Sequence, residues 1–248
     1  IGERRIQRPG RAFTRLSVTT TPTVIPRAMK HLYLAQYLVN RFGHVPGGVT
    51  PLPLQKLLYY VKAWSLVDGR DLVGVPFEKW QHGPVNRDVY QYFKRFGRAP
   101  LQPEALAPSQ EPQGATREFI DFVGHSYARF PAITLSKMTH EEDPWRLTPD
   151  DAVIADTLIA RYYAAQPFAT NLPFDPVGKP YVPVQSHMDR AATMDMSAAD
   201  AKRASTYASY QDYLARLESA GFVSRDEWLS QLLAYAGGAA PLRTRAAR

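Results

Sequence analysis

Residues 54–65 read Leu-Gln-Lys-Leu-Leu-Tyr-Tyr-Val-Lys-Ala-Trp-Ser, and they give the clearest structural signal in the sequence. Its apolar residues recur at the three- and four-residue spacing of a helix, with very few polar interruptions. Thr50 and Pro51 predict where the helix begins, as an N-cap followed by proline at the first helical position. Asp68-Gly69 predicts its end. We therefore expect a helix that lies near the centre of the core.

Helical patterns also occur on both sides of this stretch, so the sequence predicts a mainly α fold with a compact helical domain. Residues 72–80 are expected to form its one short extended or β segment, and Pro84 is expected to begin the helix that follows. A helical hairpin is expected near the C-terminus. The further predicted helices cover residues 26–42, 84–97, 118–130, 133–138, 150–165, 197–220 and 224–235.

These patterns divide the chain into five parts. They are a flexible basic arm (1–25), a helical domain (26–165), a Pro-rich strap or linker (166–195), a helical hairpin (196–237) and a basic tail (238–248).

Composition excludes several classes of site. The 248 residues include no cysteine, which excludes disulfides, thiolate metal sites and cysteine nucleophiles. The same absence suits a reducing cytoplasm, so a cytoplasmic location is expected. No apolar run approaches the roughly 20 residues that cross a bilayer, and no signal peptide is expected.

The net charge of +7 comes from the two ends of the chain. Residues 1–30 carry +6 and residues 243–248 carry +3, so the body between them sums to −2. A nucleic-acid-binding fold is expected to gather its basic residues on one face of the folded body. Nucleic acid is therefore a disfavoured partner, although a regulator that uses the basic termini stays open as an alternative.

Two short blocks mix a Trp, a His, carboxylates and a Pro where the backbone changes course. They are residues 77–90, around Trp80-Gln81-His82-Gly83-Pro84, and residues 139–145. Gly83 can take a left-handed conformation in a sharp turn. An exposed Trp80 beside Tyr90 would be an interface anchor, since Trp and Tyr dominate binding hot spots.

A metal-dependent hydrolase built on His82, His140 and Glu141 is a second alternative. Imidazole and carboxylate groups are metal ligands, but consecutive residues at a helix end point in different directions. The sequence contains no HExxH or EF-hand pattern, no Gly-x-Ser-x-Gly turn and no Walker A motif. No enzyme activity, cofactor or metal is therefore expected.

Three elements in order resemble the Panacea domain, also called the SocA-like antitoxin domain. They are the helix Leu54–Tyr60 with Trp64, the stretch Phe77–Val85, and the stretch Leu135–Trp145. The resemblance covers about residues 31–165. The residues that carry it, and that are candidates for partner binding, are Gln55, Tyr59, Tyr60, Trp64, Glu78, Trp80, His82, Gly83, Pro84, Tyr90, Thr139, His140, Pro144 and Trp145.

The resemblance implies a non-enzymatic protein that binds and neutralises a cognate toxin protein. One branch of the family resembles an adaptor that delivers its toxin to an ATP-dependent protease of the ClpXP type. Direct inhibition and delivery for degradation both stay open, because partner specificity could lie in the C-terminal part that the resemblance does not cover.

Overall fold

The computed structural model describes residues 30–43, 48–184, 209–212 and 215. The expected basic arm, most of the expected helical hairpin and the basic tail lie outside these residues. The described part is mainly α-helical, as expected. Its elements are α1 (Lys30–Phe42), α2 (Pro51–Val67), β1 (Phe77–Trp80), β2 (Gly83–Val85), α3 (Arg87–Phe93), η1 (Lys94–Phe96), α4 (Gly114–Ala128), α5 (Ala132–Glu141), α6 (Asp143–Arg146), β3 (Val153–Ile154), α7 (Asp156–Ala164) and η2 (Pro167–Asn171).

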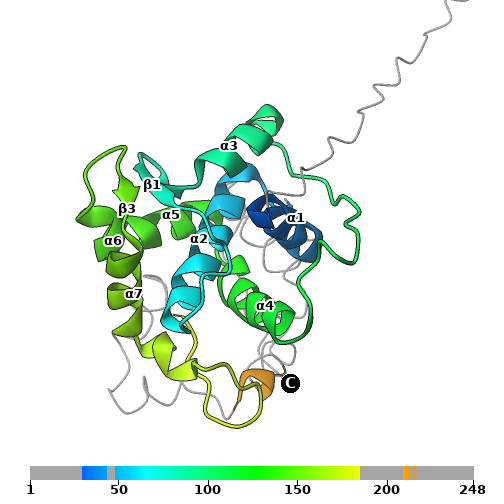
Figure 1. The fold of residues 1–248 in the computed structure, drawn as a ribbon, viewed down its shortest axis with the longest axis vertical. Coiled ribbons are helices and arrows are strands. Elements are labelled where there is room, and N and C mark those ends of the chain that lie inside the picture. The colour runs from blue at the N-terminus through cyan, green and yellow to red at the C-terminus, as the bar shows by residue number, and fades with distance from the viewer. Residues whose placement is uncertain (1–29, 44–47, 185–208, 213–214, 216–248) are drawn as a thin grey trace, which may run out of the picture.

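The helix α2 is the centre of the core, which confirms the expectation from its sequence. Figure 1 shows it running through the middle of the molecule, with α7 on one side and α1 and α4 on the other. Every residue from Leu54 to Ser65 is buried. The helix ends at Asp68, whose backbone N–H donates to carbonyls of the last turn.

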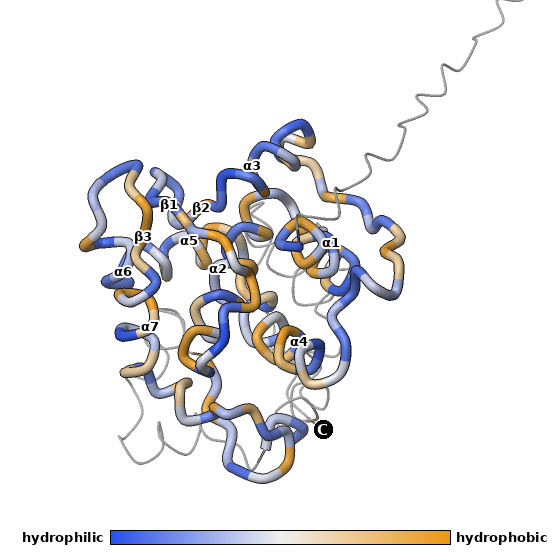
Figure 2. Tube along the Cα trace, in the orientation of Figure 1, coloured by the Kyte–Doolittle hydropathy of each residue, from blue (hydrophilic) through white to orange (hydrophobic). Residues whose placement is uncertain are grey.

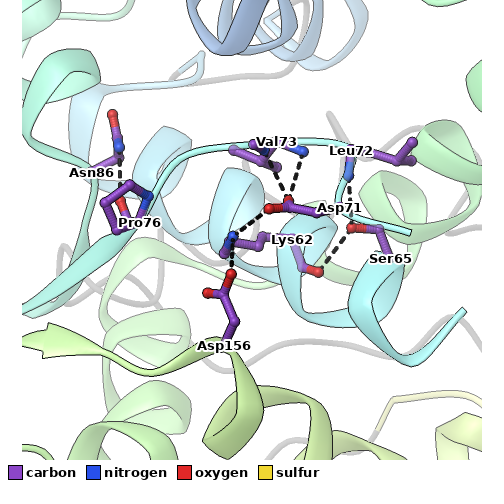
Figure 3. Close-up of polar contacts among 9 residues, drawn as sticks. Lys62, Ser65, Asp71, Leu72, Val73, Pro76, Asn86 and Asp156 are labelled. Carbon is purple, nitrogen blue, oxygen red and sulfur yellow. Dashed lines mark hydrogen bonds and ion pairs between the residues drawn. The ribbon is translucent and has the colours of Figure 1, made fainter. Parts of the chain in front are cut away.

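Two lysines share this buried helix, and each has an acceptor within reach. Lys62 is the more conventional case: its ammonium lies 2.8 Å from a carboxylate oxygen of Asp71 and 3.0 Å from one of Asp156 (Figure 3). Asp71 also accepts hydrogen bonds from the backbone N–H groups of Val73 and Gly74. One buried cation thereby ties α2 to the loop that follows it and to the first turn of α7.

A three-stranded antiparallel sheet, in the order β2-β1-β3, packs beside the N-terminal half of α2. Trp80 pairs with Gly83 across the β1–β2 turn, and Phe77 pairs with Ile154 on the other side. The expected extended segment, residues 72–80, includes β1, and it forms one arm of a hairpin with β2. The positions of β2 and β3 were not predicted from the sequence. The first residues of that segment form turns held by Asp71.

Two predicted helix starts are wrong. Pro84 lies inside β2 and not at the start of a helix, because Asn86 provides the N-cap of α3 with its side chain. Val153 and Ile154 form β3 and not the first turn of a helix, so α7 begins only at Asp156. In each case the residues pair with β1 and adopt a strand conformation, although their local sequence also suits a helix.

The tube in Figure 2 is mostly hydrophilic along α3, which matches its burial: Val89 and Phe93 are the residues of that helix that face the core. Residues 167–184 lie against the opposite end of α2. There Phe168 and Tyr181 are buried, and Tyr210 packs on the rings of Phe122 and Tyr181.

Candidate functional site

The β1–β2 turn is built around Gly83, whose φ of 97° confirms the expected left-handed backbone. A Cβ atom on Gly83 would lie 2.5 Å from Oγ1 of Thr139 and 2.6 Å from Nζ of Lys56. Lys56, which has no exposed surface, donates its ammonium to the carbonyl of Pro84 at 2.9 Å. The turn therefore fits closely over a buried lysine, and only glycine fits there.

Gln55 holds the end of the same turn from the neighbouring position on α2. Its amide donates to the backbone carbonyl of Asn86 and accepts from the backbone N–H of Asn86, at 3.2 Å and 2.8 Å. Both groups are buried, so Gln55 positions the start of α3 and does not face a partner.

The tyrosine pair at residues 59 and 60 is fully buried together with Trp64. Tyr60 donates its hydroxyl to Glu142 at 3.0 Å, and Tyr163 donates to the other oxygen of that carboxyl group at 2.5 Å. Trp64 donates its ring N–H to Tyr127 at 2.8 Å. Tyr59 and Tyr60 were candidates for partner binding, but neither ring reaches the surface, because both side chains are fully covered.

We call Lys56, Tyr60, Glu142 and Tyr163 the Glu142 cluster. Burial raises the pKa of Glu142 to about 8, against the two tyrosine hydrogen bonds and the charge of Lys56, which lower it. Burial lowers the pKa of Lys56 to about 7, and the charge of Glu142 opposes that effect. Both groups therefore exchange protons near neutral pH.

The Glu142 cluster was not predicted from the sequence. A signal for half of it was present: Lys56 stands on the most apolar helix of the chain, where a lysine must find an acceptor. Glu142 stands in a run of three carboxylates, and the sequence gives no indication of which one turns inward.

We call Glu78, Trp80, Arg87 and Tyr90 the Trp80 surface. Arg87 forms two hydrogen bonds to the Glu78 carboxylate, at 2.9 Å and 2.6 Å, and Trp80 donates its ring N–H to the same carboxylate at 2.9 Å. These bonds, first those from Arg87, hold the pKa of Glu78 below its usual value. The Trp80 and Tyr90 rings meet edge to face at 4.9 Å, and Tyr90 is 38% exposed.

The block at residues 139–145 supports this surface from below. Trp145 donates its ring N–H to the carbonyl of Trp80 at 3.1 Å. The ammonium of Lys79 lies over the Trp145 ring, 4.4 Å from the ring centroid, in a cation–π contact. Thr139 and Pro144 are buried, and Thr139 donates to the carbonyl of Ser136. These residues position the β1–β2 turn against α5.

The two histidines are placed differently. His82 is exposed in the β1–β2 turn, and its carbonyl accepts from the hydroxyl of Ser136 at 3.0 Å. His140 packs its ring 4.2 Å from that of Trp145, and burial, followed by the charge of Lys56, lowers its pKa. Within the part of the chain that the structure describes, no three His, Asp or Glu side chains are arranged to hold a metal ion.

The comparison with protein families identifies the domain that contains both sites. Residues 54–146 match the family described as Antitoxin SocA-like, Panacea domain. This stretch is a Panacea domain. It begins in α2 and ends with α6, so it includes the Trp80 surface and, apart from Tyr163, the Glu142 cluster.

A curated relative supports the assignment of the Panacea domain. The chain is 37% identical over 73 residues to the protein named Antitoxin SocA from Caulobacter vibrioides (strain NA1000 / CB15N). The match covers 29% of this chain and 39% of that protein, so less than half of either is aligned. No solved structure matches the chain. Across the residues that the structure describes, no helix is both long and apolar enough to span a membrane.

Proposed function

We propose that this protein is a non-enzymatic antitoxin that neutralises a cognate toxin protein by binding it directly. The Panacea domain at residues 54–146 is the observation that carries the proposal, because proteins with this domain are described as antitoxin-like. The Trp80 surface supplies a suitable contact, with two neighbouring aromatic rings beside the ion pair of an exposed Arg87 and a half-buried Glu78.

The Trp80 surface is pre-organised for binding. Trp80 is held by Glu78 through its ring N–H, by the ring of Tyr90 and by the guanidinium of Arg87, 5.5 Å from its centroid. Its backbone carbonyl is held by Trp145. A surface whose side chains are already ordered loses little conformational entropy when a partner binds.

Co-expression tests the proposal. The product of the neighbouring gene is produced alone and together with this protein, and growth and co-purification are measured. We expect growth to stop with the neighbour alone, to recover with both, and the two proteins to purify as one complex. An unchanged growth arrest when both are present would contradict the proposal.

Substitution of the Trp80 surface locates the contact. Trp80→Ala and Tyr90→Ala are each expected to weaken the complex by about 2 kcal/mol or more, roughly thirtyfold in Kd, as truncated hot spots do. Ile133→Ala is the control, because Ile133 is exposed and apolar but lies on α5, outside the Trp80 surface. Calorimetric titration measures the affinities, and circular dichroism checks that each variant is folded.

The proposed complex can act in two ways. A toxin that is only blocked keeps its cellular half-life when this protein is present. A toxin that is delivered to an ATP-dependent protease disappears faster, and its half-life recovers in cells that lack the protease. Pulse-chase measurement of the toxin distinguishes the two modes.

A further inference from the structure

The three-stranded sheet has one closed edge and one open edge. At the closed edge lies β2, whose residues are all buried and whose Pro84 carbonyl accepts a hydrogen bond from the ammonium of Lys56. Proline also lacks the N–H that a further strand would need. At the other end of the sheet lies β3, where Val153 is 56% exposed and Ala155, the residue after the strand, is exposed as well. A further strand can therefore reach β3 and not β2.

The pairing of β3 with β1 determines which backbone groups of Val153 point outward. The N–H of Lys79 donates to the carbonyl of Ala152 at 2.9 Å, and the next pair along the ladder is Glu78 with Val153. Hydrogen-bonded and non-hydrogen-bonded pairs alternate in an antiparallel ladder, so the N–H and C=O of Val153 point away from β1. Neither group has a hydrogen-bond partner among the residues that the structure describes.

A bulge and a helix limit this open row of backbone groups. Before Val153, Asp151 donates its N–H to the carbonyl of Lys79, so Asp151 and Ala152 together oppose one residue of β1, and Asp151 has a φ of 59°. After Val153, the N–H of Ala155 points outward again, while its carbonyl accepts from the first turn of α7. We call the N–H and C=O of Val153 and the N–H of Ala155 the β3 edge.

The side chain of Val153 connects the β3 edge to the Trp80 surface. Residues paired across antiparallel strands point to the same face of the sheet, and so do alternate residues along a strand. Val153 is paired with Glu78 and therefore shares a face with Glu78 and Trp80. A strand added at the β3 edge would thus continue the sheet on which the Trp80 surface stands.

We propose that an extended segment of the toxin binds the β3 edge as a fourth strand of the sheet. Its backbone bonds the N–H and C=O of Val153 and the N–H of Ala155, and an apolar side chain opposite Val153 covers that exposed valine. Addition of a strand to an open sheet edge is a general mode of peptide recognition, in which main-chain bonds set the register and side chains set the specificity. This inference rests on the proposed function and adds the form in which the toxin binds.

A toxin strand suits the β3 edge better than a second copy of this chain. Two β3 edges paired with each other would join strands of two residues, whereas stable interfaces bury roughly 1,200 Å² or more. A toxin that already contacts Trp80 needs only a short strand to extend its contact along the same sheet. The backbone bonds then add to a larger interface and do not have to support one alone.

Hydrogen exchange measured by NMR tests the proposal on the full chain, alone and in complex with the product of the neighbouring gene. We expect the amide protons of Val153 and Ala155 to exchange fast in the free protein and at least about tenfold more slowly in the complex. The amide of Ile133, an exposed residue in the first turn of α5, is the control and should not change. An unchanged exchange rate at Val153 in the complex would overturn the proposal.

The same experiment separates this inference from the proposed function. If no complex forms, the proposed function fails and the toxin strand fails with it. If the complex forms but Val153 stays unprotected, the fourth strand alone is refuted. Protection of Val153 already in the free protein also refutes it: protection that grows with protein concentration assigns the β3 edge to a second copy, and protection independent of concentration assigns it to another segment of this chain.

Val153→Pro removes the outward N–H without removing a bond to β1. Proline is tolerated in an edge strand where its nitrogen faces solvent, so the variant is expected to fold, as circular dichroism would check. Val153→Ala is the matched control, because it shortens the side chain and keeps the N–H. We expect Val153→Pro to bind the toxin at least about tenfold more weakly than Val153→Ala in calorimetric titration, since it loses a main-chain bond and adds a ring at the edge. Equal affinities of the two variants would contradict the fourth strand, and the exchange measurement decides if Val153→Pro does not fold.

Discussion

Among single residues, the buried Lys56 accounts for the glycine at position 83. A lysine in the centre of an apolar helix needs an acceptor for its ammonium, and the carbonyl of Pro84 provides one. The strand that brings this carbonyl close must pass directly over the lysine, which leaves no room for a side chain at residue 83. A polar residue in the core therefore dictates a glycine nearly thirty positions later.

Gly83→Ala is expected to destabilise the protein more than Gly69→Ala. Both glycines have positive φ, 97° and 76°, so both substitutions incur backbone strain, typically about 1 kcal/mol or more. A Cβ at Gly69 meets nothing within 4 Å, whereas one at Gly83 clashes with Thr139 and Lys56. Urea unfolding measures the free energy of unfolding of both variants, and the difference between their losses is the contribution of the clash. Equal losses would show that the turn can relax.

The protonated carboxyl group of Glu142 is expected to make the free energy of unfolding of the protein fall as pH rises. Its folded pKa of about 8 exceeds the ordinary value of 4.5, so the folded state binds more protons than the unfolded chain between these values. The free energy of unfolding therefore falls as pH rises from about 4.5 to about 8. Glu142→Gln removes this contribution.

Urea unfolding at pH 5.0 and 6.5 measures this effect. The free energy of unfolding of the unmodified protein should fall relative to that of Glu142→Gln between these two pH values. Both lie below the folded pKa of Lys56, about 7, so that lysine is mostly protonated in the folded state, as it is in the unfolded chain. A constant difference between the two proteins would argue against a buried, protonated carboxyl group.

At the scale of elements, the errors in the sequence analysis share a cause. Helix periodicity correctly located α2, because seventeen residues of one pattern outweigh any competing signal. The strands β2 and β3 have three and two residues, too few for a period to show. Their conformation is fixed by pairing with β1, a tertiary effect that local sequence does not carry.

The same reasoning explains which parts of the candidate site could be predicted. The left-handed backbone of Gly83 was predictable, because a glycine in a sharp turn can adopt it at no steric cost. The half-buried position of Trp80 and the full burial of Tyr59 and Tyr60 depend on which elements cover them, and that required the assembled fold. The Glu142 cluster joins residues from α2, α7 and the α5–α6 junction, which no sequence motif connects.

The N-cap of α3 carries a prediction at this scale. Asn86 accepts from the N–H of Val89 at 3.0 Å and donates to the carbonyl of Pro76 at 2.8 Å. Asn86→Ala removes both bonds and should cost about 1–2 kcal/mol in the free energy of unfolding. Gln113→Ala is the matched control, because Gln113 is an N-cap residue without a side-chain capping bond. A similar small loss in both variants would show that the cap contributes little.

At the scale of the whole molecule, the family match and the folded unit have different boundaries. The matched Panacea stretch ends at residue 146, yet α7 lies directly on α2 in Figure 1. Tyr163 and Phe168 cover Trp64, and Ile154 extends the sheet beyond β1. Residues beyond the matched stretch thus complete the core of the domain.

A chain that ends after Arg146 is therefore expected not to fold cooperatively. The loss of α7 would remove Tyr163 from the rings of Tyr59 and Trp64. It would also remove Asp156, one of the two carboxylates that bind Lys62. Circular dichroism during urea unfolding, compared with the full chain, measures this. A sharp transition of similar midpoint in the shortened chain would show that α7 is dispensable.

The complete burial of α2 also has a consequence for motion on slow timescales. Amide protons inside α2 can reach solvent only when its covering helices α1, α4 and α7 separate, and that separation amounts to unfolding the whole domain. Amides of α3, a seven-residue helix with two buried side chains, need only local opening. Hydrogen exchange should therefore be faster at the amides of α3 than at those of α2, which stay closed until the whole domain opens.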